Sequence, residues 1–442
     1  MTARTIILSA VFWGLVFTPA MVPLHTPAAE TAPPMNLAET VQAVLEANLQ
    51  AKNARQAVAA AESRVGVEKT KFLPTFSAAY QYKHHYEEIL NPIFGITTPE
   101  NEYRFTASVT QPVFTGYAIT NAYKLAGLGL DIAKLNDQLI RQQLVFEAKN
   151  AYFSVLKAEK VVGVGLEAVA LLEAFEKDAK NFYDVGMTAQ NDFLKAQVEL
   201  ANTRQQLITA NNALDVARAN FNTLLRRSVN QPVVIVDESD FSRIELTVEA
   251  CMAEAEKNRL EILVAKKRVA VSDKEVELVK KDYFPTVDVQ GNYYKAGTEI
   301  QVNGGPGVSD PESWDVRAVA TWNFWQWGRT RKGVEEKRRQ AEQTQNEFQQ
   351  VLDNIQLEVK KVYLKVTESE QNIRTVETAI SQAKENYRIS EERYKQHVAT
   401  STDVLDARTL LSRTQFNYYT ALYDLEIAKA ALARAMGRES LQ

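Results

Sequence analysis

Apolar residues follow a regular three–four spacing over several long stretches of the chain. In the second half of the sequence, apolar or small residues recur at alternating steps of three and four from 352 to 394. The stretch 144–183 has the same spacing, interrupted only by Glu176, and the segments 193–224 and 404–435 continue it. This spacing places one stripe along each helix and is typical of coiled-coil packing. We therefore predict long paired helices that approach each other closely, because many residues in the stripe are small.

The chain also repeats itself at a spacing of 211 residues. Pro74-Thr75 recurs as Pro285-Thr286, and Tyr183 recurs as Tyr394. Each half has the pattern of a helix, two strand-like stretches, a very long helix, a tight turn and a shorter helix. We accordingly divide the chain into a first repeat at 30–226, a linker at 227–248, a second repeat at 249–437 and a tail at 438–442.

The lengths of these segments predict how they are arranged. At about 1.5 Å per residue, a helix between Gly116 and Gly186 is roughly 105 Å long. The returning helix at 187–226 covers roughly 60 Å, and an opening helix at 37–71, repeated at 249–282, covers roughly 52 Å. The two shorter helices together match the long one. Each half is therefore expected to form a two-stranded rod in which the two short helices meet midway, and a compact globular core is excluded.

Two stretches alternate between apolar and polar residues instead. This period of two runs from Tyr103 to Val113 and again from Asp315 to Phe324, and turn residues rich in Pro and Gly fill 91–100 and 303–311. One apolar and one polar face suit the wall of a membrane barrel. The fold class is thus mainly α with a membrane β portion of four strands per chain. Since barrels need at least about eight strands, the subunits must associate, and three copies would supply twelve.

Three tryptophans, Trp322, Trp325 and Trp327, gather where the last strand meets the long helix of the second half. Such aromatic residues could form the belt found at membrane interfaces. They could equally pack the junction between strand and helix. The sequence leaves both possibilities open.

The composition narrows the function. The net charge of −4 gives no basic field for nucleic acid. Four histidines and one cysteine, Cys251, leave no internal disulfide and little material for a metal site. His84-His85 lies near two glutamates, but adjacent strand residues point to opposite faces, so we expect a strand end rather than a metal site. No catalytic or phosphate-binding motif stands out, and we expect neither a cofactor nor enzymatic activity.

The N-terminus has the pattern of a cleaved export signal at about 1–29. Arg4 precedes a short apolar core from Ile6 to Phe17, and small residues at Ala20 and Ala28 offer cleavage positions. This core is shorter than the roughly 20 residues of a spanning helix, and no other stretch is apolar enough to be one. The mature chain is therefore expected in the periplasm, outside the cell, or in the outer membrane as a barrel.

Several motifs, in duplicate and in order, are similar to those of the TolC family of outer-membrane efflux and secretion ducts. They are the strand starts at 72–75 and 283–286, Gln-Pro-Val-Phe-Thr-Gly at 111–116, and the hairpin tips at 183–196 and 394–407. The resemblance covers about 37–437. It implies a homotrimer with a twelve-stranded outer-membrane pore and a periplasmic helical tunnel. Such a duct exports substrates from a tripartite efflux pump or a type I secretion system.

The resemblance also implies roles for residues at the hairpin tips. A periplasmic adaptor and an inner-membrane pump would dock at the tip turns, which hold Gly186, Met187, His397 and Ala399. Asp403 and Asp406 match two family aspartates that ring the tunnel aperture, and the first half repeats only one of them, as Asp192. Capping of a helix N-terminus is the competing role, which we favour for Asp192 and Asp403, whereas Asp406 is assigned to the ring.

Tyr394, the repeat partner of Tyr183, matches a family tyrosine that helps to hold the aperture shut. Its spacing also fits the coiled-coil stripe, so both roles stay open. The family often has an arginine five residues after this tyrosine, where this chain has Ala399, and His397 replaces the glycine kept at Gly186. The contact that holds the aperture shut must therefore differ in this chain, and Lys395 and His397 are candidates for it.

The main alternative is a soluble periplasmic coiled-coil adaptor of the same kind of machine. An adaptor would hold one helical hairpin, without a duplicated half or alternating strand pairs, so the 211-residue repeat favours the duct. An ordinary porin would instead show many short strands. The exported substrate cannot be read from the sequence, because the pump makes most of that selection.

Overall fold

The computed structural model describes residues 34–440 except residues 92, 94 and 240, and the predicted export signal therefore lies outside the described residues. Helices and strands occur twice in the same order. The first repeat contains α1 (Leu37–Ala47), α2 (Leu49–Thr70), β1 (Thr75–His84), β2 (Ile89–Asn91), β3 (Gly95–Thr98), β4 (Asn101–Phe114), α3 (Ala118–Asp184) and α4 (Gln190–Leu224). The second contains α5 (Val248–Asn258), α6 (Leu260–Val279), a 3-10 turn (Lys280–Tyr283), β5 (Thr286–Gly297), β6 (Glu312–Thr321), α7 (Arg329–Lys395) and α8 (Ser401–Ala435).

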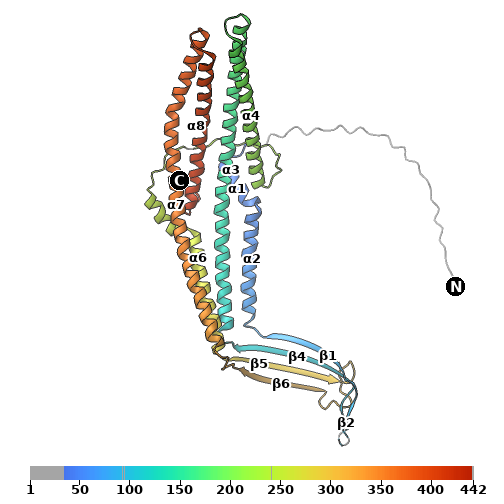
Figure 1. The fold of residues 1–442 in the computed structure, drawn as a ribbon. Coiled ribbons are helices and arrows are strands. Elements are labelled where there is room, and N and C mark those ends of the chain that lie inside the picture. The colour runs from blue at the N-terminus through green and yellow to red at the C-terminus, as the bar shows by residue number, and fades with distance from the viewer. Residues whose placement is uncertain (1–33, 92, 94, 240, 441–442) are drawn as a thin grey trace, which may run out of the picture.

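The helices form two parallel rods. The long helices α3 and α7 have 67 residues each, which corresponds to roughly 100 Å. In Figure 1, α2 and α4 follow each other along α3, and α6 and α8 follow each other along α7. The predicted rods with short helices meeting midway are confirmed. Among the described residues, three apolar clusters fill them. Two lie around Tyr152 and Val359, and the third, around Tyr394, joins the two hairpins near their tips.

The opening helix of each repeat is broken, which the sequence did not predict. Asn48 and Arg259 have extended backbones and separate α1 from α2 and α5 from α6. Each side chain reaches the end of the returning helix of its own repeat. Asn48 Nδ2 donates to the Leu224 carbonyl at 3.4 Å, and Arg259 Nη1 donates to the Ala435 carbonyl at 3.2 Å. The residue at each break therefore donates a hydrogen bond to a carbonyl at the C-terminal end of a helix, where carbonyls lack a partner within the helix.

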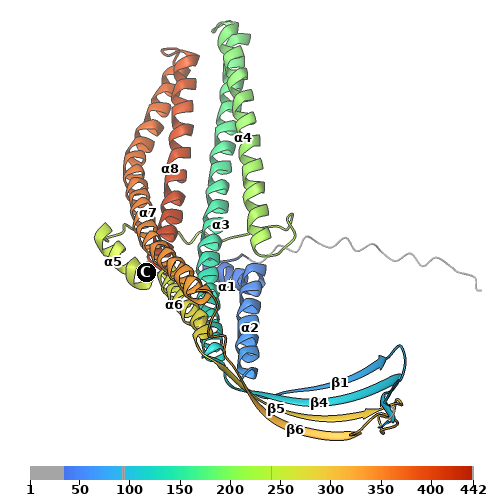
Figure 2. The same cartoon turned by 60° about the horizontal axis from the view of Figure 1, so that its bottom comes forward.

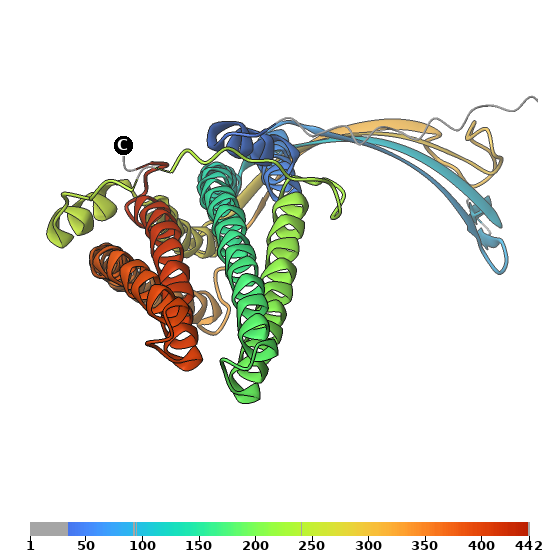
Figure 3. The same ribbon diagram turned by 90° about the horizontal axis from the view of Figure 1, so that it is seen from above.

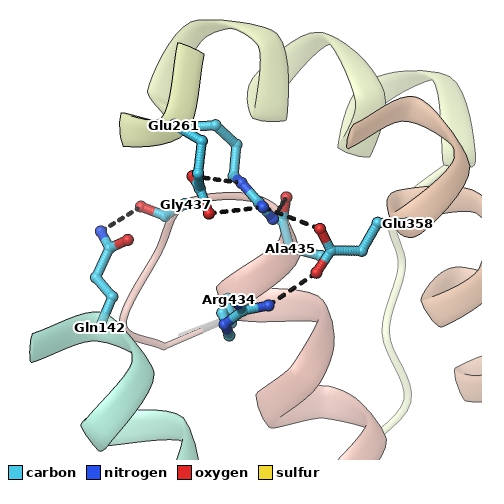
Figure 4. A network of polar contacts seen from close by, with 7 residues as sticks. Gln142, Glu261, Glu358, Arg434, Ala435 and Gly437 are labelled. Carbon is cyan, nitrogen blue, oxygen red and sulfur yellow. Dashed lines mark hydrogen bonds and ion pairs between the residues drawn. The ribbon is translucent and has the colours of Figure 1, made fainter. Parts of the chain in front are cut away.

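Arg259 is also the centre of a polar network that ties the second repeat together (Figure 4). Its Nη2 lies 2.8 Å from Glu261 and 2.9 Å from Glu358, and Glu358 lies 2.8 Å from Arg434. Gln142 of α3 donates to the Gly437 carbonyl at 3.4 Å beside this network. Helices α3, α6, α7 and α8 thus meet at the middle of the rods.

The main sheet has four antiparallel strands in the order β1-β4-β5-β6. The central pair, β4 and β5, joins the two repeats, and its register shifts once, between Pro112 and Phe114. Figures 2 and 3 show the sheet as a curved layer that projects away from the helices. The first predicted turn, at 91–100, is more structured than expected because β2 and β3 form a small hairpin there. In this sheet, β1 and β6 are edge strands with one open side each.

The linker between the repeats crosses the middle of the rods. Met35 and Ile235 form a parallel bridge, the hydroxyl of Tyr152 donates to the Val236 carbonyl, and the Tyr423 hydroxyl donates to Asp237 Oδ2 at 2.7 Å. Cys251 is buried on α5, as expected for a small apolar side chain. Within the described part of the chain, no helix is both long and apolar enough to cross a membrane.

Candidate functional site

One face of the four-stranded sheet is apolar across all its strands. The register places Phe76, Val109, Gly291 and Val316 in one row. The next row on the same face, two residues along each strand, holds Ala78, Ala107, Tyr293 and Trp314, because side chains in strands alternate between faces. Phe76, Val316 and Trp314 are largely exposed in the single chain. An exposed apolar face that runs across four strands marks contact with a partner or a membrane.

The opposite face is polar. One of its rows holds Ser77, Ser108, Asn292 and Asp315, and Asn292 donates to Asp315 at 3.0 Å. In the neighbouring row, Arg317 donates to Gln290 from two guanidinium nitrogens at 3.0 and 2.8 Å. Strands with one apolar and one polar face are suited to separate lipid from water.

Aromatic residues bound the apolar face at both ends. Trp314 and Trp322 are eight residues apart, which corresponds to about 26 Å along a strand and resembles the roughly 25 Å apolar band of membrane barrels. At the helix end, Trp322, Phe324, Trp325 and Trp327 are 57%, 78%, 67% and 87% exposed. The tryptophans therefore do not pack the junction within this chain, and of the two possibilities the belt is favoured. The aromatic residues at the far end are Tyr80, Tyr82, Tyr103, Tyr293 and Trp314.

The two tip tyrosines have different surroundings. Tyr394 of α7 is 4% exposed, and its ring lies 5.0 Å from Phe175 and 5.7 Å from Phe182 of α3. Its hydroxyl has no hydrogen-bond partner among the described residues, and burial, reinforced by nearby aspartates, raises the pKa of Tyr394. Tyr183 is more exposed and stacks on Phe193. Tyr394 thus joins the two hairpins of the chain through its ring.

The three tip aspartates also differ from one another. Asp403 accepts a hydrogen bond from the Thr400 backbone N–H at 2.8 Å, in a capping box with Thr400 as the N-cap. These bonds from Thr400 lower the pKa of Asp403. The capping role is confirmed for Asp403 but wrong for Asp192, because α4 begins after Ala189 without any side-chain cap. A methyl side chain cannot accept the bond, and Asp192 instead lies 4.0 Å from Lys195.

Asp406 lies one helical turn beyond Asp403. It is exposed and has no hydrogen bond or ion pair with any residue that the structure describes. No residue that the structure describes therefore pairs with this carboxylate. It is available to a solvent-filled space or to a neighbouring subunit.

Both tip turns have a left-handed residue at the same position of the repeat. Gly186 has φ 77° and His397 has φ 60°, so the histidine occupies a left-handed position that glycine adopts without strain. The His397 ring lies 4.8 Å from Phe182 of the other hairpin, whereas Lys395 pairs with Glu391 of its own helix at 2.9 Å. Of the two candidates for the closing contact, only His397 reaches across. The turn residues Gly186 and Met187 are exposed, and Ala399 is half-buried.

Sequence reasoning missed the partners of Tyr394. Phe175 and Phe182 are seven residues apart. The predicted apolar stripe passes through Glu176 and Tyr183, so each phenylalanine lies one residue before a stripe position and was not included in it. It also missed Arg408 of α8, which is 2% exposed and whose three guanidinium nitrogens have no hydrogen-bond partner among the described residues. Its guanidinium lies 5.7 Å from the centre of the Tyr387 ring. No pattern along the chain distinguishes this arginine from an exposed one.

Comparisons with known proteins agree with this arrangement. The profile of a family described as outer membrane efflux protein matches residues 40–225 and 252–438. The outer membrane protein TolC of Escherichia coli K12 is 21% identical over 391 residues, which cover 86% of this chain and 77% of TolC. The solved structure of VceC from Vibrio cholerae has a TM-score of 0.78 at 14% identity, covering 92% of this chain and 97% of VceC.

A second solved structure, the CmeC outer membrane channel of Campylobacter jejuni, has a TM-score of 0.77 at 14% identity. The superposition covers 91% of this chain and 85% of CmeC. The fold is therefore shared although few residues are identical, and the predicted resemblance to the TolC family is confirmed. The chain belongs to the outer membrane efflux protein family.

Proposed function

We propose that three copies of this chain form an outer-membrane duct that exports substrates received from an inner-membrane pump. The observation that carries the proposal is the four-stranded sheet, which has one apolar face, one polar face and an open edge on each side. Unpaired backbone groups at a sheet edge cannot be left in lipid. Pairing β1 of one subunit with β6 of the next would satisfy them, and three subunits would close twelve strands around a polar lumen.

The helical rods continue the duct into the periplasm. They extend roughly 100 Å from the sheet, and the turns that join α3 to α4 and α7 to α8 lie at the end opposite the sheet in Figure 1. An adaptor and a pump would contact these tips at Gly186, Met187, His397 and Ala399. Type I secretion systems and tripartite efflux pumps both fit this geometry, and transport through an open lumen needs no catalytic group or cofactor.

At the tips, Asp406 is the side chain we assign to the aperture ring, with Asp403 and Asp192 near it. Three subunits would bring three uncompensated Asp406 carboxylates to a narrow passage, which favours cations over anions. Tyr394 supports the closed arrangement through its ring, while Tyr183 has a lesser part because it stacks within its own hairpin.

Two measurements test these proposals. Cell fractionation and native mass spectrometry should find detergent-soluble outer-membrane trimers, whereas periplasmic monomers would support the soluble adaptor instead. In planar bilayers, Asp406→Ala should reduce the cation preference of the trimer. Asp353→Ala removes an equally exposed carboxylate of α7 farther from the tips and should leave the preference unchanged. If the parent and both variants have the same preference for cations over anions, Asp406 is not part of the aperture ring.

A further inference from the structure

The junction between β6 and α7 combines exposed aromatic side chains with exposed cations. We name this surface the junction band and define it by Trp322, Phe324, Trp325 and Trp327 together with Lys281, Arg329 and Arg331. The aromatic rings contact one another, Trp322 with Phe324 and Trp325 with Trp327. The four aromatic residues line a hollow of about 200 Å³ together with Asp282 and the two arginines.

The first repeat lacks this band. With the 211-residue offset, the four aromatic positions correspond to Gln111, Val113, Phe114 and Gly116. Phe114 packs edge-to-face against Tyr117 and Phe284, with ring centres 5.5 and 6.3 Å away. In the first junction the Phe114 ring is thus half-buried against its own chain, whereas all four aromatic rings of the second junction are exposed. The shared fold does not require the exposed aromatic residues.

Trp327 shows this most clearly. Its φ of 49° is left-handed, and its counterpart Gly116 has a φ of 60°. A bulky residue in this region is strained, and such strain persists where the surroundings or a function require it. The indole contacts Trp325 but is still 87% exposed, so packing within the chain offsets little of the strain. A partner outside the chain is the remaining source of compensation.

The cations of the band also form no ion pairs with described residues. Lys280 pairs with Glu277 and Lys332 pairs with Glu335. In contrast, Lys281, Arg329 and Arg331 form no ion pair with any residue in the described ranges, and all three are exposed. Asp282 is the one carboxylate among the described residues that line the hollow, and three cations against one carboxylate give the band a net positive charge. The complementary partner is therefore an anion that also offers apolar surface to the rings.

We propose that the junction band binds an anionic phospholipid of the leaflet that faces the periplasm. This inference rests on the proposed function, which places the band where the apolar face of the sheet ends and the helices begin. Indole rings settle at the level of lipid headgroups. Arginine side chains bind phosphate through paired hydrogen bonds, so the lipid phosphate would lie beside Arg329 and Arg331 and its acyl chains along the apolar strands.

Tryptophan fluorescence tests the proposal in the intact trimer. The purified protein carrying Trp314→Phe is placed in vesicles that contain brominated phosphatidylglycerol or brominated phosphatidylcholine at equal mole fraction. Its remaining described tryptophans all belong to the band. The anionic lipid should quench the fluorescence more strongly. Its apparent affinity, obtained from the quenching, should be about fivefold higher for each cation that reaches the phosphate.

Charge-removing variants identify the residues responsible. The triple variant K281Q/R329Q/R331Q should quench equally with both lipids. The matched variant K361Q/R374Q/K384Q removes three exposed cations elsewhere on α7 and should keep the preference for the anionic lipid. Trp327→Gly should weaken that preference without lowering the thermal stability of the trimer, since glycine relieves the strained backbone.

The outcomes separate this inference from the proposed function. Equal quenching by both lipids in the parent protein, or an unchanged preference in K281Q/R329Q/R331Q, would overturn the lipid site. Quenching by neither lipid, in trimers that still conduct ions, would show that a neighbouring subunit covers the band, which also overturns the site but leaves the duct intact. Failure to form conducting trimers at all would contradict the duct itself.

Discussion

Replacing Arg408 with methionine is expected to stabilise the protein. The guanidinium is 2% exposed and lies between α7 and α8 without a hydrogen-bond partner among the described residues. Burial lowers the pKa of Arg408, and Tyr387 and Glu167 only partly oppose this shift. The folded state therefore holds a cation at a position where its charged form is disfavoured.

The size of the effect follows from two opposing contributions. An unsatisfied buried polar group costs about 1–3 kcal/mol, and the contact with the Tyr387 ring returns roughly 0.5–1 kcal/mol. Methionine keeps the length of the side chain and can pack its sulfur against the same ring. The net gain is then about 1–2 kcal/mol for each subunit. With an unfolding entropy of about 2.1 cal/mol/K for each of roughly 400 residues, Tm should rise by about 1–3 °C.

Differential scanning calorimetry of the purified trimer in detergent measures this change. Arg413→Met is the matched control, because Arg413 is exposed on the same helix and surface changes usually stay within about 0.5 kcal/mol. A fall in Tm for Arg408→Met, with Arg413→Met unchanged, would refute the reasoning. It would mean that Arg408 is fully compensated in the folded state.

Three further predictions concern the tips and the linker. Tyr394→Phe should leave the closed trimer as poorly conducting as the parent in planar bilayers, because the hydroxyl has no hydrogen-bond partner among the residues that the structure describes, whereas Tyr394→Ala should raise the conductance. Thr400→Ala removes an N-cap and should cost about 1 kcal/mol by denaturant unfolding. Because the pKa of Asp403 is lowered in the folded state, the contribution of this cap should be complete above the unfolded pKa of the carboxyl group and lost as pH falls through the folded value. Tyr423→Phe breaks the bond to Asp237 and should cost about 1.5–3 kcal/mol, and an unchanged Tm would contradict this value.

The two repeats share a backbone but differ in the chemistry placed on it. Left-handed residues recur at the same offset of 211, at Gly186 and His397 and at Arg226 and Gly437. The exchanges at these shared positions carry the specific features of this protein. His397 gives the second tip an aromatic contact with Phe182, and Trp327 gives the second junction an exposed indole.

The sequence determined the parts of this protein that depend on local periodicity. The three–four spacing predicted the long helices, the segment lengths predicted their pairing into rods, and the alternation in the strands predicted an apolar and a polar face. These features could be predicted because helix and strand geometry fix which side chains share a face. The motifs at the hairpin tips similarly indicated the family, whose profile matches both halves.

Only the tertiary structure decided the features that depend on contacts between distant segments. Asn48 and Arg259 break their helices to reach carbonyls at the ends of α4 and α8. Asparagine is a common N-cap residue but arginine is not, so residue type alone did not indicate both breaks. The packing around Tyr394 arises where hairpins of different repeats meet, and Arg408 is buried where α7 and α8 pack together. The exposure of the tryptophans likewise depends on what packs beside them. Local sequence cannot specify such neighbours, because they are set by the three-dimensional packing of the whole chain.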